Sequence, residues 1–260
     1  MQPVSLHTTS YGESGSRVVF CHGLFGQGRN WTQHARALAA RHRVLLVDMP
    51  NHGRSPWSDR MDYVWMADQV AELLDPADPV ALVGHSMGAK ASMILALRHP
   101  ELVERLMVVD MAPVAYANGS GFRGYIDAML GADLAPGASR EDADAALRDA
   151  VPDTGVRSFL LQNLRRTPEG WAWQPNLALL RDELGTISGW PAEAVAGLPP
   201  YAGPVLWVGG ADSGYVKDEY APAMEALFPR VRKVMIKGAG HWVHSEQPEV
   251  FREVLQRFVG

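Results

Sequence analysis

Short, nearly continuous apolar runs recur in the first and last parts of the chain. They occupy residues 17–21, 44–47, 79–83, 105–109, 204–208 and 231–236. Runs of this length without polar alternation are typical of strands that are buried on both faces. Segments with apolar residues at helical spacing, such as 31–40 and 63–74, lie between them. The alternation predicts an α/β fold, with a mostly parallel sheet covered by helices on both faces.

The pattern changes between residues 116 and 198. Strand-like runs disappear there, and Gly and Pro separate short stretches with helical periodicity at 124–130, 139–151, 156–166 and 176–184. We therefore expect a core formed by residues 1–115 and 199–260. Residues 116–198 are expected to form an all-helical insertion that precedes the last strands in the sequence. Such an insertion would cover an active site at the edge of the sheet as a cap or lid.

The pentapeptide from Gly84 to Gly88 has the form G-x-S-x-G. An apolar run precedes it and a helical stretch, 89–97, follows it. Strand, sharp turn and helix are the context in which this motif forms a nucleophile elbow, a strained turn that projects the serine hydroxyl above the sheet. The sequence therefore predicts Ser86 as a catalytic nucleophile.

A serine hydroxyl needs a base to act as a nucleophile at neutral pH. His241 follows a predicted strand and the glycine-containing segment 237–240, which lets the loop fold back toward the elbow. We expect His241 to be the general base. His244, His85 and His22 are expected to order the last helix, the elbow and a glycine turn, respectively.

Two aspartates are candidates for the acid that orients the histidine. Asp110 ends the strand at 105–109, and Asp212 follows the strand at 204–208. Both positions lie at carboxyl ends of strands, where catalytic groups gather in open α/β sheets. When the loop is aligned on Tyr215 and His241, Ser213 falls at the usual acid position and Asp212 lies one residue early. The pattern favours Asp110 and leaves Asp212 open.

Acyl transfer also requires hydrogen-bond donors for the negative charge that develops on the carbonyl oxygen. The residue after the nucleophile, Met87, supplies one backbone amide by the elbow geometry. The second is expected from the loop at 22–26, where Gly23 permits a close approach and Leu24 offers its N–H. Phe25 is the less suitable donor.

Together these stretches resemble the α/β-hydrolase superfamily over essentially the whole chain and, within it, the bacterial YbfF-type esterases and their mitochondrial relatives. The resemblance rests on residues 22–26, 48–55, 84–90, 110–114 and 240–244. It implies an acyl-ester or acyl-thioester hydrolase without a metal or organic cofactor. It also implies that Asp110 is the acid partner, with Ser213 beside the site. The chain departs from the group at Asp212, where the group tends to have asparagine.

The predicted reaction is hydrolysis of a carboxylic ester or thioester through a covalent acyl-enzyme on Ser86. A carbon–carbon bond hydrolase or a menaquinone-type lyase would use the same three residues and is the alternative. A non-catalytic ligand sensor is an alternative of another class. Candidates to line an acyl pocket between insertion and core are Trp171, Trp173, Phe159, Leu177 and Trp190, or these residues bury the insertion against the core. Phe25 and Ser213 are also candidates for substrate binding.

Composition and charge limit the classes of molecule that the protein is expected to bind. The formal net charge is −5 and no Lys/Arg run occurs, which argues against a nucleic-acid surface. No apolar run approaches the length of a membrane helix, and residues 1–5 lack the features of a signal peptide. The only cysteine, Cys21, excludes an intramolecular disulfide. We expect a cytoplasmic enzyme with a small-molecule substrate, no membrane partner and no metal; the sequence does not predict an oligomeric state.

Overall fold

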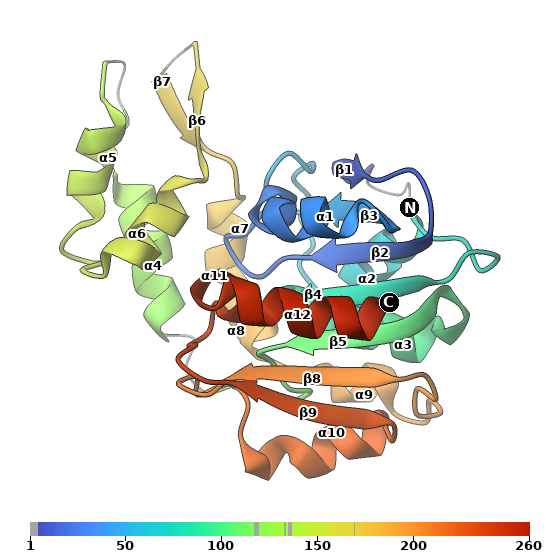
Figure 1. Ribbon diagram of the computed structural model, residues 1–260. Coiled ribbons are helices and arrows are strands. Elements are labelled where there is room, and N and C mark those ends of the chain that lie inside the picture. Colours follow the sequence, from blue (N-terminus) through green and yellow to red (C-terminus); the bar gives the residue numbers. More distant parts are fainter. Residues whose placement is uncertain (1–4, 117–119, 133, 135–136, 169) are drawn as a thin grey trace.

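A computed structural model describes residues 5–116, 120–132, 134, 137–168 and 170–260 (Figure 1). The expectation about a signal peptide concerns residues 1–5, of which residues 1–4 lie outside this range. The domain prediction also includes residues outside it, namely 117–119, 133, 135–136 and 169. Within the described residues no helix is both long enough and apolar enough to cross a membrane.

A seven-stranded sheet forms the centre of the molecule (Figure 1). Its strands are β1 (Thr8–Tyr11), β2 (Ser16–Cys21), β3 (His42–Val47), β4 (Val80–His85), β5 (Val103–Val109), β8 (Val205–Gly210) and β9 (Val231–Ile236). Their spatial order is β1-β3-β2-β4-β5-β8-β9. All neighbours are parallel except β1, which pairs antiparallel with β3. The predicted mostly parallel sheet is confirmed, and β1 is an addition that its polar sequence conceals.

Both faces of the sheet are buried, as the continuous apolar runs require. In β2, Val18 and Phe20 point into one hydrophobic cluster, whereas Val19 and Cys21 point into the other. This alternation follows from the two-residue period of a strand. Helices α1 (Thr32–Leu38) and α12 (Pro248–Val259) cover the first face, and α2 (Tyr63–Ala71), α3 (Met87–Arg98) and α10 (Ala221–Leu227) contribute to the second. The remaining core elements are η1 (Gly28–Trp31), η2 (Pro100–Leu102), η3 (Asp218–Tyr220) and α11 (Val243–Glu246).

The segment between β5 and β8 forms the insertion, which extends beyond the carboxyl ends of the strands (Figure 1). Its elements are α4 (Ser120–Gly131), α5 (Arg140–Leu147), α6 (Thr154–Leu161), β6 (Leu164–Thr167), β7 (Gly170–Trp173), α7 (Leu177–Asp182), α8 (Leu184–Ser188) and α9 (Ala192–Val195). Four of the helices overlap the predicted stretches. The insertion is not all-helical, however, because β6 and β7 form an antiparallel hairpin.

The hairpin corrects the predicted helix over 156–166. Helix α6 ends at Leu161, and Asn163 then turns its amide toward the loop after β2, where it bonds to the Phe25 carbonyl. Pro168 further disfavours helix in the residue before it, and Gly170 adopts a φ of 130° at the start of β7. The contact to Phe25 joins residues far apart in the sequence, so local periodicity does not reveal it.

The end of the insertion is attached to α2 and α3 by buried polar contacts. The Tyr63 hydroxyl donates to the Ile187 carbonyl at 2.5 Å, and the Lys90 ammonium donates to the Ser188 carbonyl at 2.9 Å. Lys90 is 1% exposed, and burial lowers its pKa to about 7. These contacts fix the polypeptide that returns from the insertion to the core.

Candidate active site

Ser86 occupies a strained turn between β4 and α3. Its φ of 53° lies in the left-handed region, which a residue with a Cβ adopts only when the surroundings enforce it. The flanking glycines make the turn possible. A Cβ on Gly88 would lie 2.4 Å from the Cys21 and His22 carbonyl oxygens, and one on Gly84 would lie 2.6 Å from the Ala89 Cα. The two glycines of the motif are therefore steric requirements of the elbow.

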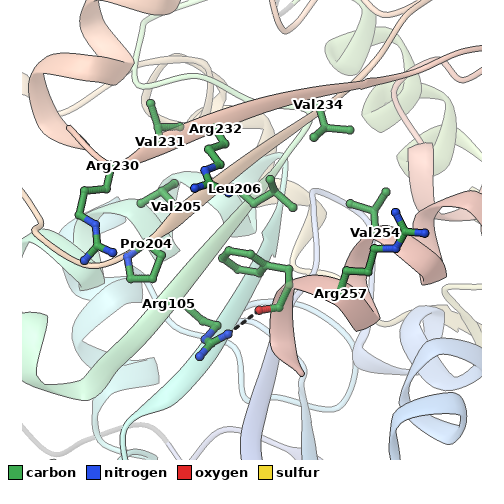
Figure 2. Close-up of a pocket in the computed structure, with 11 residues that line it drawn as sticks. Arg105, Pro204, Val205, Leu206, Arg230, Val231, Arg232, Val234, Val254 and Arg257 are labelled. Atoms are coloured by element: carbon green, nitrogen blue, oxygen red, sulfur yellow. Dashed lines mark hydrogen bonds between the residues drawn. The ribbon is translucent and has the colours of Figure 1, made fainter.

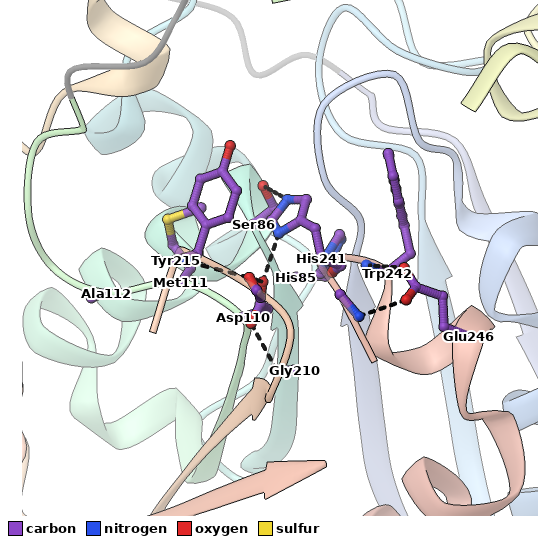
Figure 3. Close-up of polar contacts among 12 residues, drawn as sticks. His85, Ser86, Asp110, Met111, Ala112, Gly210, Tyr215, His241, Trp242 and Glu246 are labelled. Atoms are coloured by element: carbon purple, nitrogen blue, oxygen red, sulfur yellow. Dashed lines mark hydrogen bonds and ion pairs between the residues drawn. The ribbon is translucent and has the colours of Figure 1, made fainter. Parts of the chain in front are cut away.

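Three predicted residues meet at the carboxyl ends of β4, β5 and β9 (Figure 3). His241 Nε2 lies 3.0 Å from Ser86 Oγ, and His241 Nδ1 lies 2.8 Å from Asp110 Oδ2. A carboxylate only accepts hydrogen bonds, so Nδ1 carries the proton and donates a hydrogen bond to Asp110. Nε2 is then unprotonated and accepts from the Ser86 hydroxyl. This is the arrangement in which a histidine removes a proton from serine.

Asp110 is fully buried and is held by donors on both oxygens. The Gly210 N–H donates to Oδ1 at 2.9 Å (Figure 3). The Ser213 hydroxyl donates to Oδ2 at 2.5 Å. Together with His241, these donors compensate the carboxylate for the loss of water. The residue also has a left-handed φ of 48°, a second strained position at the site.

The other candidate acid, Asp212, lies elsewhere. It is exposed, and in the described part of the chain its side chain makes no hydrogen bond or ion pair, while its backbone N–H donates to the Ala239 carbonyl. Ser213, the next residue, reaches Asp110 instead. The one-residue offset noted in the sequence thus corresponds to a side chain that is turned away from His241. Ser213 contacts the carboxylate and lines neither cavity beside Ser86.

The loop that carries His241 is fixed on both sides of the histidine. The Glu246 carboxylate accepts from the Gly240 N–H at 2.6 Å and the Trp242 N–H at 3.1 Å. His85 Nε2 donates to the His241 carbonyl at 2.8 Å, and the Tyr215 ring stacks on the imidazole at 4.2 Å between centroids. Sequence reasoning missed Glu246; its signal is an acidic residue in the short helix directly after a catalytic-loop histidine.

The loop after β2 lies against the nucleophile. A Cβ on Gly23 would lie 3.0 Å from the Ser86 Cβ, so the chain approaches the elbow as closely as a glycine permits. The Gly26 N–H donates to the Gly23 carbonyl at 2.9 Å, which closes a turn around Leu24 and Phe25. His22 Nδ1 donates to the Gly23 carbonyl and its Nε2 accepts from the Met49 N–H. The turn is therefore braced beside Ser86.

The backbone N–H groups of Leu24 and Met87 are the expected oxyanion donors. Met87 is the first residue of α3, where an N–H has no helical partner. Among the turn and loop hydrogen bonds of the described residues, neither N–H donates to a backbone carbonyl. Both amides are thus available beside Ser86, and their catalytic role stays a prediction.

Two small cavities adjoin Ser86, with volumes of about 20 Å³ and 30 Å³. Leu24 and Phe122 line both. The first continues toward Phe25, Phe159 and Trp242, and the second toward Tyr63, Met111 and Tyr116. About 10–15 Å³ of such volume holds one water molecule, so each cavity has room for one or two waters and an acyl chain requires side-chain movement.

Trp171 and Trp173 line neither of these cavities. Both belong to β7 and, two residues apart, point to the same face of the hairpin. Their indole N–H groups donate within the insertion, to the Ala138 and Met129 carbonyls at 2.8 Å and 2.7 Å. The structure thus places these tryptophans in the packing of the insertion. It gives no support at these cavities to the predicted contact with substrate.

Two larger grooves differ in their relation to Ser86. One, of about 680 Å³, lies between α6 and the His241 loop and shares Val156, Phe159 and Trp242 with the first cavity. The other, of about 740 Å³, lies at the amino ends of β8 and β9 (Figure 2). Arginines surround its apolar floor, but it contains no nucleophile and lies at the opposite end of the sheet. Of these two grooves, the first adjoins the candidate site, with Val156, Phe159 and Trp242 lying between groove and cavity.

Within the described residues, neither Cys21 nor a metal-binding cluster forms a second site. Burial raises the pKa of the Cys21 thiol to about 12, so this cysteine stays protonated and is a poor nucleophile. Among the described residues, no group of three or more His, Cys, Asp or Glu side chains is arranged to hold a metal ion.

Buried neutral histidines predict that the protein loses stability in mild acid. Burial lowers the pKa of His22 to about 4 and the pKa values of His52 and His244 to about 3. In the unfolded chain these groups bind protons below about pH 6.5, so stability is full above that value and falls as pH decreases toward 4. At pH 5 the cost is about 2 kcal/mol for each histidine, since one pH unit corresponds to about 1.4 kcal/mol.

Urea unfolding at pH 7 and pH 5 measures this loss. His244 stacks on Trp31 at 4.1 Å between centroids, so His244→Phe keeps a ring there while removing one titrating group. We expect this variant to lose about 2 kcal/mol less than the wild type between the two pH values. Equal losses in both proteins would show that the histidines do not cause the acid sensitivity.

Comparisons with known proteins agree with this architecture. The chain is 38% identical over 250 residues to a Mus musculus protein named sn-1-specific diacylglycerol lipase ABHD11, covering 93% of this chain and 80% of that protein. It is 33% identical to Esterase YbfF of Escherichia coli K12, covering 98% of each. A solved structure described as a marine microorganism esterase has a TM-score of 0.92 and 32% identity, covering 98% of this chain and 99% of that one.

The family resemblance expected from the sequence is thereby confirmed. The model of the alpha/beta hydrolase fold family matches residues 16–248, which include β2, the elbow and the His241 loop. The protein belongs to the alpha/beta hydrolase fold family.

Proposed function

We propose that the protein hydrolyses carboxylic esters or acyl thioesters through a covalent acyl-enzyme on Ser86. The observation that carries the proposal is the continuous hydrogen-bonded line from Ser86 Oγ through His241 to the buried Asp110 carboxylate. The esterase and lipase names of the relatives support the same reaction class. No step in it requires a cofactor.

In the proposed reaction, the Ser86 hydroxyl attacks the acyl carbon while His241 Nε2 takes its proton. Asp110 accepts from His241 Nδ1 and stabilises the imidazolium that forms. The Leu24 and Met87 amides hold the oxyanion of the tetrahedral intermediate. His241 then protonates the leaving alcohol or thiol. In the second half it activates the water that releases the acid.

Residues 116–198 act as a cap over a core formed by residues 1–115 and 199–260 in this proposal. Phe122 and Phe159 come from the insertion and line the cavity at Ser86, opposite Leu24 and Trp242 from the core. The substrate therefore lies between the two parts of the chain. Phe159 and Trp242, with ring centroids 5.7 Å apart, separate this cavity from the outer groove of about 680 Å³.

A series of p-nitrophenyl esters from acetate to palmitate tests the proposal. We expect the purified wild type to hydrolyse at least the shorter members, because the cavities at Ser86 are small. Absence of hydrolysis across the series would contradict a general esterase. A carbon–carbon hydrolase or lyase would instead act on a diketone or enol-forming substrate, and a ligand sensor would show only a ligand-dependent rise in melting temperature.

The substitution Phe159→Ala is expected to shift the preferred acyl group toward longer chains. Removing the ring joins the cavity at Ser86 to the outer groove, so an extended chain gains room and apolar contact. We expect the ratio of kcat/KM for octanoate over butyrate to rise about tenfold, which corresponds to about 1.4 kcal/mol. The same ester series measures it.

Trp171→Phe is the control for this shift. It removes the hydrogen bond to the Ala138 carbonyl at a position that lines neither cavity. We expect an unchanged chain-length ratio with a slightly lower melting temperature. A shift in Trp171→Phe but not in Phe159→Ala would place the acyl chain beside β7 and restore the original prediction for the tryptophans.

A further inference from the structure

One buried side chain connects the insertion to the loop after β2. Asn163 lies between α6 and β6 and is fully buried. Its Nδ2 donates to the Phe25 carbonyl at 2.8 Å and to the Leu160 carbonyl at 3.2 Å, while its Oδ1 accepts from Gln27 Nε2 at 3.2 Å. Every polar atom of this amide is therefore used, and two of its partners belong to the core loop.

The bond to Phe25 acts on a strained residue. Phe25 has a φ of 60°, a left-handed conformation that costs a residue with a side chain about 1–2 kcal/mol. Relaxing this φ would rotate the peptide group between Leu24 and Phe25. That peptide group is next to the one that carries the Leu24 N–H, so the rotation would change the direction of this donor. The Asn163 amide holds the next peptide through the Phe25 carbonyl and so opposes that relaxation. The turn hydrogen bond between Gly26 and Gly23 closes the loop from its other side.

We propose that Asn163 is a positioning residue for the oxyanion hole, acting from the insertion through the Phe25 carbonyl on the turn that presents the Leu24 amide. The proposal deepens the acyl-transfer function and rests on it. Asn163 touches neither the nucleophile nor the substrate cavities, so its effect passes entirely through the loop. The insertion then contributes to catalysis as well as to covering the substrate.

The neighbouring residue provides a matched comparison. Gln162 also joins the insertion to the core loop, since its Oε1 accepts from Asn30 Nδ2 at 2.8 Å. Asn30 belongs to η1, beyond the turn at residues 23–26, and the Gln162 side chain makes no contact with the Phe25 carbonyl among the hydrogen bonds of the described residues. Removing the Gln162 side chain therefore weakens the docking of the insertion without releasing the turn.

A displaced oxyanion donor lowers transition-state binding more than ground-state binding. Complete loss of one such donor costs about 10²–10³-fold in kcat. Because the Leu24 amide remains present in an Asn163 variant, we expect a smaller loss. For Asn163→Ala the expected fall in kcat is roughly 10- to 100-fold, with KM within about threefold of the wild type. Gln162→Ala should stay within about twofold in both constants.

The experiment measures kcat and KM for p-nitrophenyl butyrate, together with the rate constant for labelling of Ser86 by a fluorophosphonate. Labelling passes through a transition state with negative charge on the phosphoryl oxygen, so it depends on the same donors without requiring ester turnover. We expect labelling to slow by a factor similar to the fall in kcat. Melting temperatures are measured for every variant.

Asn163→Asp provides a second variant in case Asn163→Ala does not fold. It is nearly isosteric and keeps an acceptor for Gln27, but it replaces the donor to the Phe25 carbonyl with a carboxylate oxygen. The same selective loss of kcat and of labelling rate is expected. An unchanged kcat in a folded Asn163 variant, a rise in KM alone, or equal losses in Gln162→Ala would each overturn the positioning role. If the wild type is labelled but hydrolyses no ester, the esterase proposal fails, while the labelling rates still decide the role of Asn163.

Discussion

Ser86→Ala is expected to abolish ester hydrolysis while leaving the fold intact. The hydroxyl that it removes is the one that lies 3.0 Å from His241 Nε2. The Cβ, which the strained turn already accommodates at a φ of 53°, remains. Loss of the nucleophile in a Ser-His-Asp site lowers kcat by about 10⁶-fold. We therefore expect turnover of p-nitrophenyl butyrate at the background rate, and an unchanged circular dichroism spectrum and melting temperature within about 2 °C.

A buried serine within α3, the helix that follows Ser86, serves as the control. Ser92 is 1% exposed, lies further along α3 and, among the hydrogen bonds of the described residues, forms none with His241. Ser92→Ala should therefore retain activity close to the wild type. Mass spectrometry after fluorophosphonate treatment should locate the label on Ser86 in the wild type and find none in Ser86→Ala. Residual turnover above about one hundredth of the wild-type value would exclude Ser86 as the only nucleophile.

Asp110→Asn is expected to lower kcat by about 10⁴-fold, the loss known for this exchange in a Ser-His-Asp triad. The asparagine amide has only one acceptor oxygen. With its NH2 group toward His241 Nδ1 it donates where the carboxylate accepted, so the imidazole is no longer held with its unprotonated Nε2 toward Ser86. The imidazolium that forms during attack also loses its negative partner. Because three donors converge on the fully buried carboxylate, the change affects stability as well. Urea unfolding beside the kinetic assay separates the two effects.

Asp212→Asn is the matched control, since the same exchange is made two residues beyond β8. Asp212 is exposed and its side chain has no ion pair within the described residues, so we expect kcat within about twofold of the wild type. The double variant should behave as Asp110→Asn alone. The assignment of the acid would be reversed if Asp212→Asn lost activity by orders of magnitude while Asp110→Asn did not.

Local patterns predicted much of the core. The apolar runs gave strands β2, β3, β4, β5 and β8 because a strand buried on both faces leaves a continuous apolar signature. The run at 231–236 also gave β9, although β9 is an edge strand on which Arg232, Lys233 and Met235 are exposed. The elbow was equally predictable from the sequence, because close contacts with neighbouring atoms require glycine at positions 84 and 88. In contrast, β1 is a polar edge strand and was not predicted.

Spacing alone did not distinguish the two acids. Asp110 and Asp212 both follow buried strands, and those strands are neighbours in the sheet, so either aspartate starts at the correct edge. In the structure the two aspartate side chains point in different directions. At Asp110 a left-handed φ of 48° accompanies the contact with His241, while Asp212 faces solvent. A backbone conformation of this kind depends on the packing of the whole loop.

The insertion was the least predictable region. Its helices are short, and the periodic stretch at 156–166 divides into α6 and β6 where Asn163 bonds to Phe25. Trp171 and Trp173 were candidates for a pocket because large aromatic rings often line one, yet their N–H groups are used within the insertion. Phe159, which had no stronger signal in the sequence, lines the cavity at Ser86.

The sequence by itself determined the fold class, the family, and the elbow and loop motifs that carry Ser86 and His241. These depend on hydrophobic period and on glycines whose steric role is local. Only the tertiary structure decided which aspartate reaches the histidine, which aromatic rings face the cavity, and how the insertion is bonded to the turn beside the nucleophile. Each of these depends on side-chain direction and on hydrogen bonds between residues distant in sequence, such as Asn163 with Phe25, and such contacts leave no periodic trace along the chain.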